Sequence, residues 1–387
     1  MIAIINGKII KRDCLIENEV VLFDNKIKDI LDIAQFNNII KNNKYGEIEV
    51  IDAKGNYISP GFIDLHIHGS AGKDTMDGSI EDLKVISKAI SKNGVTSFLP
   101  TTMTMSKEKI YKALDTVKKG MKMDLGGAKI LGAHMEGPFI NENYKGAQKD
   151  DYILEPYYEF IKGYEDIIKI ITIAPERDYN FEFIKSIKKN TNIVLSMGHT
   201  NATYEEAMEA IENGVSRATH LFNAMSPLNH RNPGVVGAVL ESHINAEFIA
   251  DKIHIHPGIF QLVLNVKGKD KVILITDSMR AGCMKDGISE LGGQKVIVKN
   301  NSARLEDGTL AGSILTLNKA VKNIMENTTL KIYETIVLAS LNAARDIGID
   351  DKKGSIEIGK DADIIIFDEN FDVKQTIVEG NILFNEG

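Results

Sequence analysis

Two histidines separated by one residue, His66 and His68 in the segment DLHIH, stand in a short apolar run. If this run is a strand, both imidazoles project to the same side and can share one metal ion. The pair is weak evidence by itself, because two histidines near a strand end are also often satisfied by their neighbours. It indicates a metal site only if further ligands follow along the chain.

Three more residues of ligand type follow, each at or near the end of an apolar run: Glu136 in GAHMEGPF, His199 in LSMGHT and His220 in RATHLF. A carboxylate placed like Glu136 must be paired, solvated or bound to metal. Two imidazoles and one carboxylate form a ligand set that leaves a coordination position open for water. We predict a divalent metal site, with Zn, Fe, Mn and Co all compatible with these ligands. His134, two residues before Glu136, is expected to orient a ligand.

Asp277 follows the apolar run of ILITDSM and has two interpretations. In the first, it is a turn or helix-capping residue. In the second, it is a general base that takes a proton from water activated by the metal and returns it to the leaving group. The second interpretation makes Asp277 the catalytic residue of a hydrolase.

The elements that must position these residues are eight short apolar runs, which we predict to be strands. Amphipathic segments that we predict to be helices separate many of them, for example 79–94, 106–121, 181–190 and 203–214. This alternation predicts an α/β fold, a (β/α)8 barrel of the TIM type, whose chemistry lies at the C-terminal strand ends. An open doubly wound sheet is the alternative, but no GxGxxG follows an early strand. The eight runs are 63–68, 95–101, 128–136, 166–175, 192–199, 217–222, 246–251 and 271–277.

Both chain ends show a different sequence pattern, with short β-type runs that end at Asn, Asp or Gly. We therefore predict a small β-sandwich domain built from residues 1–57 and 354–387. The catalytic barrel is predicted to span residues 58–353 between them.

The composition excludes several classes of protein. A net charge of -8 over 387 residues argues against a nucleic-acid surface, and no window approaches the roughly 20 apolar residues of a membrane span. The two cysteines, Cys14 and Cys283, are far apart and form no CxxC pair. We expect a cytoplasmic protein without membrane or nucleic-acid partners.

The motifs PGFIDLHIHG, HMEGPF, GHT, THLFNAM, HRNPG, LITD and DGTLAGS, in this order, resemble the N-acetylglucosamine-6-phosphate deacetylases of the amidohydrolase superfamily. The resemblance runs from about Asp52 to Asp363. It implies hydrolysis of the acetamide of N-acetylglucosamine 6-phosphate to glucosamine 6-phosphate and acetate. It also implies one metal held by Glu136, His199 and His220, with Asp277 as proton donor and acceptor. Retention of His66 and His68 implies a possible second metal, bridged by Glu136.

Substrate contacts are carried over by the same motifs, with an acetylated amino-sugar phosphate as the expected partner. Many members have His where this chain has Gln148, so polarisation of the acetamide carbonyl is expected from the metal or the Gln amide. A homodimer is implied, with His254 reaching the neighbouring site. Gly312 would permit close approach of a loop, although TLAGS could instead start a helix capped by Ser313. The matching positions are Ala147 and Gln148, Asn223 and Ala224, Arg231 and His254 for the phosphate, and Leu310, Ala311 and Gly312.

Three alternatives stand beside this interpretation. Deacetylation of the galactosamine epimer differs by one inverted hydroxyl. Hydrolysis of a cyclic amide, as in relatives of dihydroorotase, commonly uses a carboxylated Lys where this chain has Glu136. A non-catalytic scaffold is the third, and such proteins usually lack some of the ligands.

Overall fold

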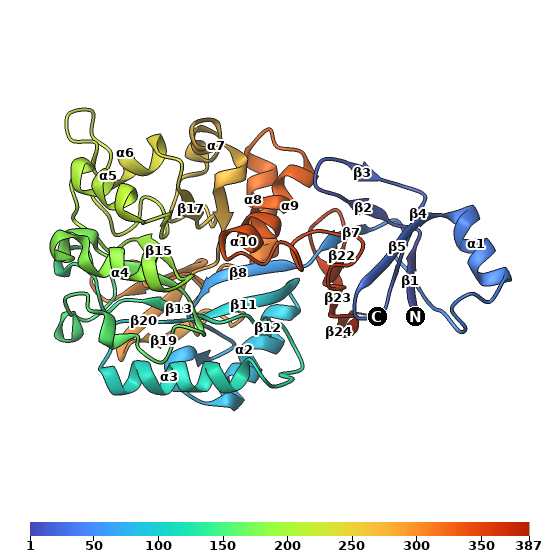
Figure 1. The fold of residues 1–387 in the computed structure, drawn as a ribbon, viewed down its shortest axis with the longest axis horizontal. Coiled ribbons are helices and arrows are strands. Elements are labelled where there is room, and N and C mark those ends of the chain that lie inside the picture. The colour runs from blue at the N-terminus through green and yellow to red at the C-terminus, as the bar shows by residue number, and fades with distance from the viewer. Residues whose placement is uncertain (387) are drawn as a thin grey trace.

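A ring of eight parallel strands is the centre of the computed structural model, which describes residues 1–386 (Figure 1). Neighbouring strands pair in parallel from the first to the last, and a parallel bridge between Ile67 and Ser278 joins the two ends of the series. Asp64 also links the first and last strands of the barrel, because its carboxylate accepts a hydrogen bond from Thr276 Oγ1 at 2.6 Å. The predicted (β/α)8 barrel is confirmed. Its strands are β8 (Phe62–Ile67), β11 (Val95–Thr102), β13 (Ala133–Glu136), β14 (Ile168–Ile173), β15 (Val194–Met197), β16 (Arg217–Ala218), β17 (Asn245–Phe248) and β18 (Val272–Leu274), with the short β12 (Lys129–Ile130) beside β11.

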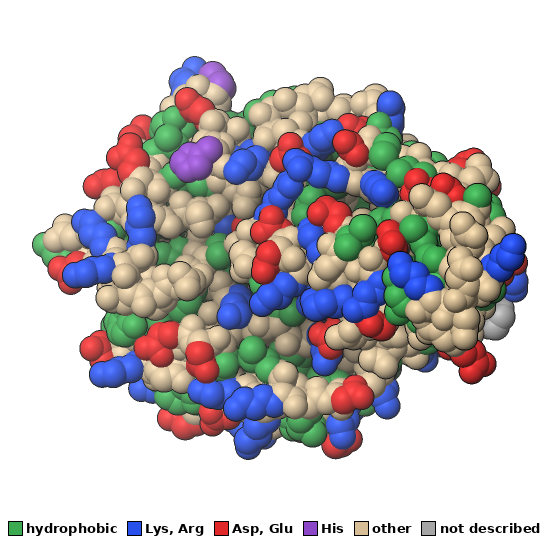
Figure 2. Space-filling model, turned by 45° about the vertical axis from the view of Figure 1, so that its right-hand side comes forward, with side chains coloured by type: hydrophobic (Ala, Val, Ile, Leu, Met, Phe, Trp, Pro, Cys, Tyr) green, Lys and Arg blue, Asp and Glu red, His purple; other side chains and the backbone are tan. Residues whose placement is uncertain are grey.

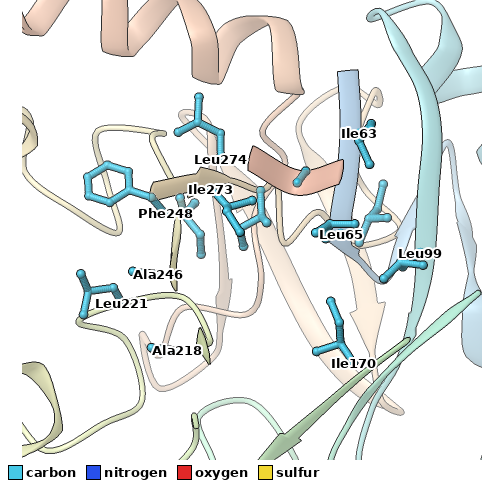
Figure 3. Close-up of a cluster of buried hydrophobic side chains, with 14 of the residues drawn as sticks. Ile63, Leu65, Leu99, Ile170, Ala218, Leu221, Ala246, Phe248, Ile273 and Leu274 are labelled. Atoms are coloured by element: carbon cyan, nitrogen blue, oxygen red, sulfur yellow. The ribbon is translucent and has the colours of Figure 1, made fainter. Parts of the chain in front are cut away.

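Apolar side chains of the barrel strands and of the helices around them form one large buried cluster. Figure 3 shows Ile63 and Leu65 of β8 near Leu99 of β11, and Ile273 of β18 belongs to the same buried cluster. Polar side chains are buried between the strands as well: His134 lies 2.8 Å from Thr172 Oγ1, and Arg217 pairs with Glu247. In barrels of this type the chemistry lies at the C-terminal ends of the strands.

Helices alternate with the strands, and four of them match the predicted segments: α2 (Ile80–Ser91), α3 (Lys107–Gly120), α4 (Glu182–Asn190) and α5 (Tyr204–Asn213). Side-chain oxygens of Ser79, Ser106 and Thr203 accept backbone N–H bonds at the starts of α2, α3 and α5. The remaining barrel helices are α6 (Gly234–Glu241), α7 (Phe260–Lys267), α8 (Leu317–Asn327), α9 (Ile332–Ala339) and α10 (Leu341–Asp346). Short 3₁₀ turns are η1 (Thr75–Asp77), η2 (Glu142–Tyr144), η3 (Asp150–Tyr152), η4 (Tyr158–Phe160), η5 (Pro175–Arg177), η6 (Tyr179–Phe181), η7 (Pro257–Ile259) and η8 (Lys269–Lys271).

Two further sheets come from the chain ends, as predicted, and lie at one side of the barrel (Figure 1). The four-stranded sheet has the order β5-β4-β1-β6, and the six-stranded sheet, β24-β23-β22-β7-β2-β3, combines both ends. The exact domain limits, 1–57, 58–353 and 354–387, stay a prediction. The strands are β1 (Ile2–Ile5), β2 (Lys8–Ile10), β3 (Leu15–Ile16), β4 (Glu19–Phe23), β5 (Ile27–Asp32), β6 (Glu49–Asp52), β7 (Tyr57–Pro60), β22 (Ile364–Phe367), β23 (Val373–Val378) and β24 (Asn381–Asn385).

Three features differ from the sequence-based expectations. Helix α1 (Ile33–Lys41) interrupts the N-terminal strands. A small antiparallel sheet of β19 (Gly287–Leu291), β20 (Gln294–Lys299) and β21 (Ser302–Leu305) follows β18, and a two-stranded ribbon of β9 (Gly69–Ser70) and β10 (Lys73–Asp74) follows β8. Ser313 is not a helix cap, because α8 begins only after Thr316 and the Ser313 hydroxyl donates to the carbonyl of Thr276 at 2.6 Å.

The surface carries both signs of charge, and Lys and Arg side chains are intermixed with Asp and Glu on the face in Figure 2. Among residues 1–386, no helix combines the length and apolar character that crossing a bilayer requires. Both cysteines are free thiols, one half-buried and one exposed.

A buried lysine at the end of α7 gives the fold a testable pH dependence. The Lys267 ammonium donates to the carbonyls of Val239 at 2.5 Å and Ser242 at 2.6 Å, at the C-terminal end of α6. Burial lowers the pKa of Lys267 to about 8, against about 10.4 in an unfolded chain. Between these values the unfolded chain holds the proton more tightly, so the stability contributed by Lys267 rises with pH.

We expect the free energy of unfolding of the wild type, relative to the variant Lys267→Met, to rise by about 1–2 kcal/mol between pH 8 and pH 10. Denaturant unfolding at both pH values measures this difference. The exposed Lys109 of α3 supplies the control, and Lys109→Met should show no such change. A Lys267→Met difference that is constant with pH contradicts the prediction.

Candidate active site

All six residues predicted to carry the chemistry come together at the C-terminal end of the barrel. Glu136 is the last residue of β13, whereas His199, His220 and Asp277 follow the ends of β15, β16 and β18. These three residues have positive φ values of 48°, 30° and 48°. This left-handed backbone is costly for residues with a side chain, and strained positions of this kind cluster at functional sites. The left-handed backbone at these three positions turns the chain sharply just after each strand, where the site residues lie.

Glu136, His199 and His220 form the first group of residues that lie close enough together to hold a metal ion. Glu136 Oε1 lies 3.1 Å from Nε2 of each histidine, and the two Nε2 atoms lie 3.1 Å apart. Each Nδ1 faces a backbone carbonyl, that of Tyr144 at 2.9 Å and that of Asn223 at 3.0 Å. Since carbonyls only accept hydrogen bonds, both Nδ1 atoms carry a proton, and both Nε2 atoms converge on Glu136. Two Nε2 atoms beside a carboxylate are favourable only when they hold a proton or when a metal ion lies between them, so the donor set fits a metal ion.

His66, His68 and Glu136 form the second group. Nε2 of His66 lies 3.4 Å from Glu136 Oε1, and Nε2 of His68 lies 3.2 Å from Glu136 Oε2. His66 Nε2 is buried and has no hydrogen-bond partner, which a metal ion would satisfy. Glu136 belongs to both groups, so its carboxylate lies close to all four of these histidines.

The electrostatics keep the carboxylates ionised despite their burial. Burial alone would raise the pKa of Glu136, but His199 and His66 beside it hold that pKa well below its usual range. The pKa of Asp277 is lowered in the same way, because the neighbouring His66 and His68 outweigh burial. Both groups are therefore available at neutral pH as acceptors of a proton or a cation.

Asp277 faces the histidines and does not cap a helix. Its Oδ1 lies 3.4 Å from Nε2 of His68 and 3.6 Å from Nε2 of His66. Its backbone N–H donates to the carbonyl of His66, and its carbonyl accepts from the N–H of Ser313. These backbone hydrogen bonds hold Asp277 where the first and last strands of the barrel meet, and its carboxylate lies close to His66 and His68.

A cavity of about 320 Å³ opens in front of these groups and is large enough for a sugar phosphate. Most of the predicted site residues line it: His68, Glu136, Ala147, Gln148, His199, His220, Asn223, Ala224, His254, Asp277, Leu310 and Gly312. His66 lies behind the other ligands with no exposed surface, and Ala311 is fully buried in the loop wall. Residues not expected from the sequence complete the lining: Met103, Asn143, Tyr144, Gly146, Leu291 and Thr309.

Gln148 lies at the metal groups as well as in the cavity wall. Its carbonyl oxygen accepts the backbone N–H of Thr104 at 2.7 Å, and its amide nitrogen donates to Glu136 Oε2 at 2.9 Å. The same nitrogen lies 3.4 Å from Nε2 of His199. The Thr104 contact orients the amide, so that its N–H donors face the cavity and the ligands.

The two residues expected to bind phosphate lie apart. His254 lines the cavity of its own chain, and its Nδ1 is held by Asp251 Oδ2 at 2.6 Å. Arg231 is exposed and lines a different depression, formed by residues 201–205, 226, 227, 229 and 231–234. His230 and His256 are both exposed surface residues.

Glu247 is a buried acid of β17 that the sequence analysis did not select. It has no exposed surface, forms an ion pair with Arg217 and accepts a hydrogen bond from His66 Nδ1 at 2.9 Å. Burial would raise the pKa of Glu247, but Arg217 and His66 lower it strongly. The signal that identified Glu136, an acid in an otherwise apolar strand, is also present in the segment AEFIAD.

A barrel with His and Glu ligands at its strand ends defines a class of metal-dependent hydrolases, and the amidohydrolase family model matches residues 57–383. The chain therefore belongs to the amidohydrolase family. As a member it is an enzyme, a hydrolase that depends on a divalent metal ion.

Comparison with individual proteins is more specific. The chain is 41% identical to N-acetylglucosamine-6-phosphate deacetylase of Bacillus subtilis, over 92% of this chain and 96% of that protein. It is 33% identical to N-acetylgalactosamine-6-phosphate deacetylase of Escherichia coli O157:H7, over 87% and 90% of the two chains. The crystal structure of N-acetylglucosamine-6-phosphate deacetylase from Pasteurella multocida superposes with a TM-score of 0.91 at 33% identity, covering 98% of each chain.

Proposed function

We propose that this enzyme hydrolyses N-acetylglucosamine 6-phosphate to glucosamine 6-phosphate and acetate. The observation that carries the proposal is the convergence of His199 Nε2, His220 Nε2 and Glu136 Oε1 within 3.1 Å of one another in a cavity that Asp277 also lines. The similarity to the named deacetylases supports the choice of substrate. The non-catalytic alternative loses its basis, because every expected ligand residue is present at the site.

Glu136, His199 and His220 are proposed to hold one divalent ion, and His66, His68 and the bridging Glu136 a second. When bound, a divalent ion lowers the pKa of water and polarises a carbonyl group. Asp277 then acts as the general base that accepts the proton of the attacking water. Once protonated, its carboxyl group donates that proton to the amine, which is otherwise a poor leaving group. Zn, Fe, Mn and Co all accept these ligands.

Gln148 is proposed to help polarise the acetamide carbonyl in place of the histidine common among relatives. We expect Gln148→Leu to lower kcat by about 100-fold, the effect typical of losing one donor to a developing oxyanion. Metal content at saturating metal should stay that of the wild type, because the substitution keeps every His and Glu of the two groups.

Gln148→His serves as the matched comparison for this prediction, because an imidazole N–H restores a donor. Steady-state acetate release, with metal content measured on the same samples, separates the variants. A Gln148→Leu enzyme with wild-type kcat excludes the amide from this role.

The sugar phosphate is proposed to lie in the cavity, with Ala147, Asn223, Ala224 and the loop of Leu310, Ala311 and Gly312 around the sugar, and with its phosphate near His254. Arg231 does not line this cavity, so we propose that it comes from a second copy of the chain in a homodimer. This assigns to Arg231 the contact across subunits that the sequence suggested for His254. The cytoplasmic location expected from the sequence stays a prediction.

Complementation tests the shared site. Arg231→Ala and Asp277→Asn are each expected to be nearly inactive alone, but mixed dimers contain one complete site and should regain activity. Light scattering gives the mass of the assembly. Absence of recovery in mixed dimers of confirmed composition contradicts the contact across subunits.

The central experiment is acetate release from N-acetylglucosamine 6-phosphate, with and without a chelator. We expect turnover that the chelator abolishes and that added divalent metal restores. The galactosamine epimer is the second candidate substrate, because one of the similar proteins is named for it. A higher kcat/KM for N-acetylgalactosamine 6-phosphate would reverse the assignment, and no release from either compound would refute the proposed reaction.

A further inference from the structure

Glu247 is tied to both groups of metal ligands from behind. Its Oε2 accepts the Nδ1–H of His66 at 2.9 Å and the backbone N–H of His220 at 2.9 Å. Its Oε1 forms an ion pair with the fully buried Arg217. One carboxylate therefore contacts a ligand from each group without lining the cavity itself.

A second acid, Asp346, contacts Arg217 and holds the ion pair between Arg217 and Glu247 in place. Arg217 also pairs with Asp346 at the end of α10, and Asp346 Oδ1 accepts a hydrogen bond from the Asn245 amide at 2.6 Å. A buried arginine between two carboxylates is fixed in position, because each charge would be costly to leave unpaired. Glu247 thus has little freedom to move away from His66.

The hydrogen bond between His66 and Glu247 determines which ring nitrogen of His66 is free to bind a metal ion. An ionised carboxylate only accepts hydrogen bonds, so Nδ1 of His66 carries the proton and Nε2 presents its lone pair. Nε2 is the atom that lies 3.4 Å from Glu136 Oε1 and has no hydrogen-bond partner. We propose that Glu247 is a positioning residue for the metal ion held by His66 and His68, fixing both the tautomer and the ring orientation of His66. This inference rests on the proposed two-metal centre.

A metal ion between Glu247, His66 and His134 is the competing arrangement, because these three residues also lie close enough to share one. His134 is unsuited to it, since its Nδ1 faces the carbonyl of Leu65 at 3.1 Å and its Nε2 faces Thr172 Oγ1 at 2.8 Å. The guanidinium of Arg217 on Glu247 would also repel a cation placed there. Glu247 is therefore better described as a partner of a ligand than as a ligand.

The test measures metal binding in the absence of substrate, by titrating metal-free protein with Zn²⁺ or Co²⁺ in competition with a chelator. The wild type should bind two ions per chain. In Glu247→Gln we expect one ion to bind about 10- to 100-fold more weakly, the usual cost of removing the partner of a ligand. The other ion should bind as before, because the ring of His220 is held independently by the carbonyl of Asn223.

Two further variants keep the test decisive. Glu247→Asp retains the charge for Arg217 but withdraws the carboxylate from His66, so it should reproduce the selective loss. Asp346→Asn removes the other partner of Arg217 and leaves the His66 contact intact, so it should bind both ions normally. Thermal unfolding of each variant shows whether the fold is kept.

Wild-type affinity for both ions in Glu247→Gln and Glu247→Asp would overturn the inference. Equal weakening of both ions, matched by Asp346→Asn, would also overturn it, because the network would then act only on the fold. A wild type that binds a single ion at saturation would leave no ion for Glu247 to position and would overturn it as well. None of these results depends on acetate release, so the proposed reaction is tested separately.

Discussion

Replacing Asp277 by Asn is expected to lower kcat for acetate release by about 10³-fold or more, while the metal content stays that of the wild type. Proton transfer by a positioned side chain contributes about 10²- to 10⁴-fold, and Asp277 is proposed to transfer a proton twice. An asparagine amide has nearly the same shape and keeps the backbone bonds to His66 and Ser313, but it neither accepts the proton of water nor donates one to the amine.

Kinetics and metal analysis on the same preparation separate the outcomes for Asp277. Metal binding should persist, because Asp277 is absent from both ligand groups formed with Glu136. Retained turnover would remove Asp277 from the mechanism. Loss of turnover together with loss of metal would instead make it a ligand.

Replacing Glu136 by Gln is expected to remove metal and activity together. Glu136 is the carboxylate shared by the two proposed ion sites, and its oxygens face histidine nitrogens at 3.1 to 3.4 Å on both sides. An amide of the same size carries no charge and cannot bridge two cations. We expect metal affinity to fall by more than the roughly 10- to 100-fold cost of losing a partner of a ligand.

Titration with Zn²⁺ and acetate release at saturating metal test this second prediction. Glu142→Gln is the matched control, because it makes the same substitution at an exposed residue of η2. The control should bind metal and turn over normally. Stoichiometric metal in Glu136→Gln would contradict the proposed bridging role.

Much of the barrel was predictable from local pattern. Strands buried within a parallel sheet are nearly continuous apolar runs, and all six residues of β8 and all eight of β11 are buried. The sheet of β19 to β21 was not predicted, because β20 is exposed at alternate positions and carries no such run. As a consequence, the sequence analysis did not predict that Leu291 of β19 lines the cavity.

The ligand residues were recognisable because a polar side chain at the end of an apolar run needs a partner. The same rule applied to Glu247, but its partner Arg217 lies thirty residues earlier and pairs with it only through the neighbouring strands β16 and β17. Arg231 illustrates the opposite case, since the motif that contains it matches a phosphate contact while the folded chain places it outside the cavity.

Residue types and their order along the chain by themselves indicated the barrel, the proposed ligand set of Glu136, His199 and His220, and the similarity to deacetylases. Tertiary structure decided how those ligands are presented. The protons of His199 and His220 are assigned by backbone carbonyls at Tyr144 and Asn223, and that of His66 by Glu247. A carbonyl is present at every residue, so only the folded backbone determines which one meets an imidazole. The coordinating face of each histidine is therefore a property of the closed barrel.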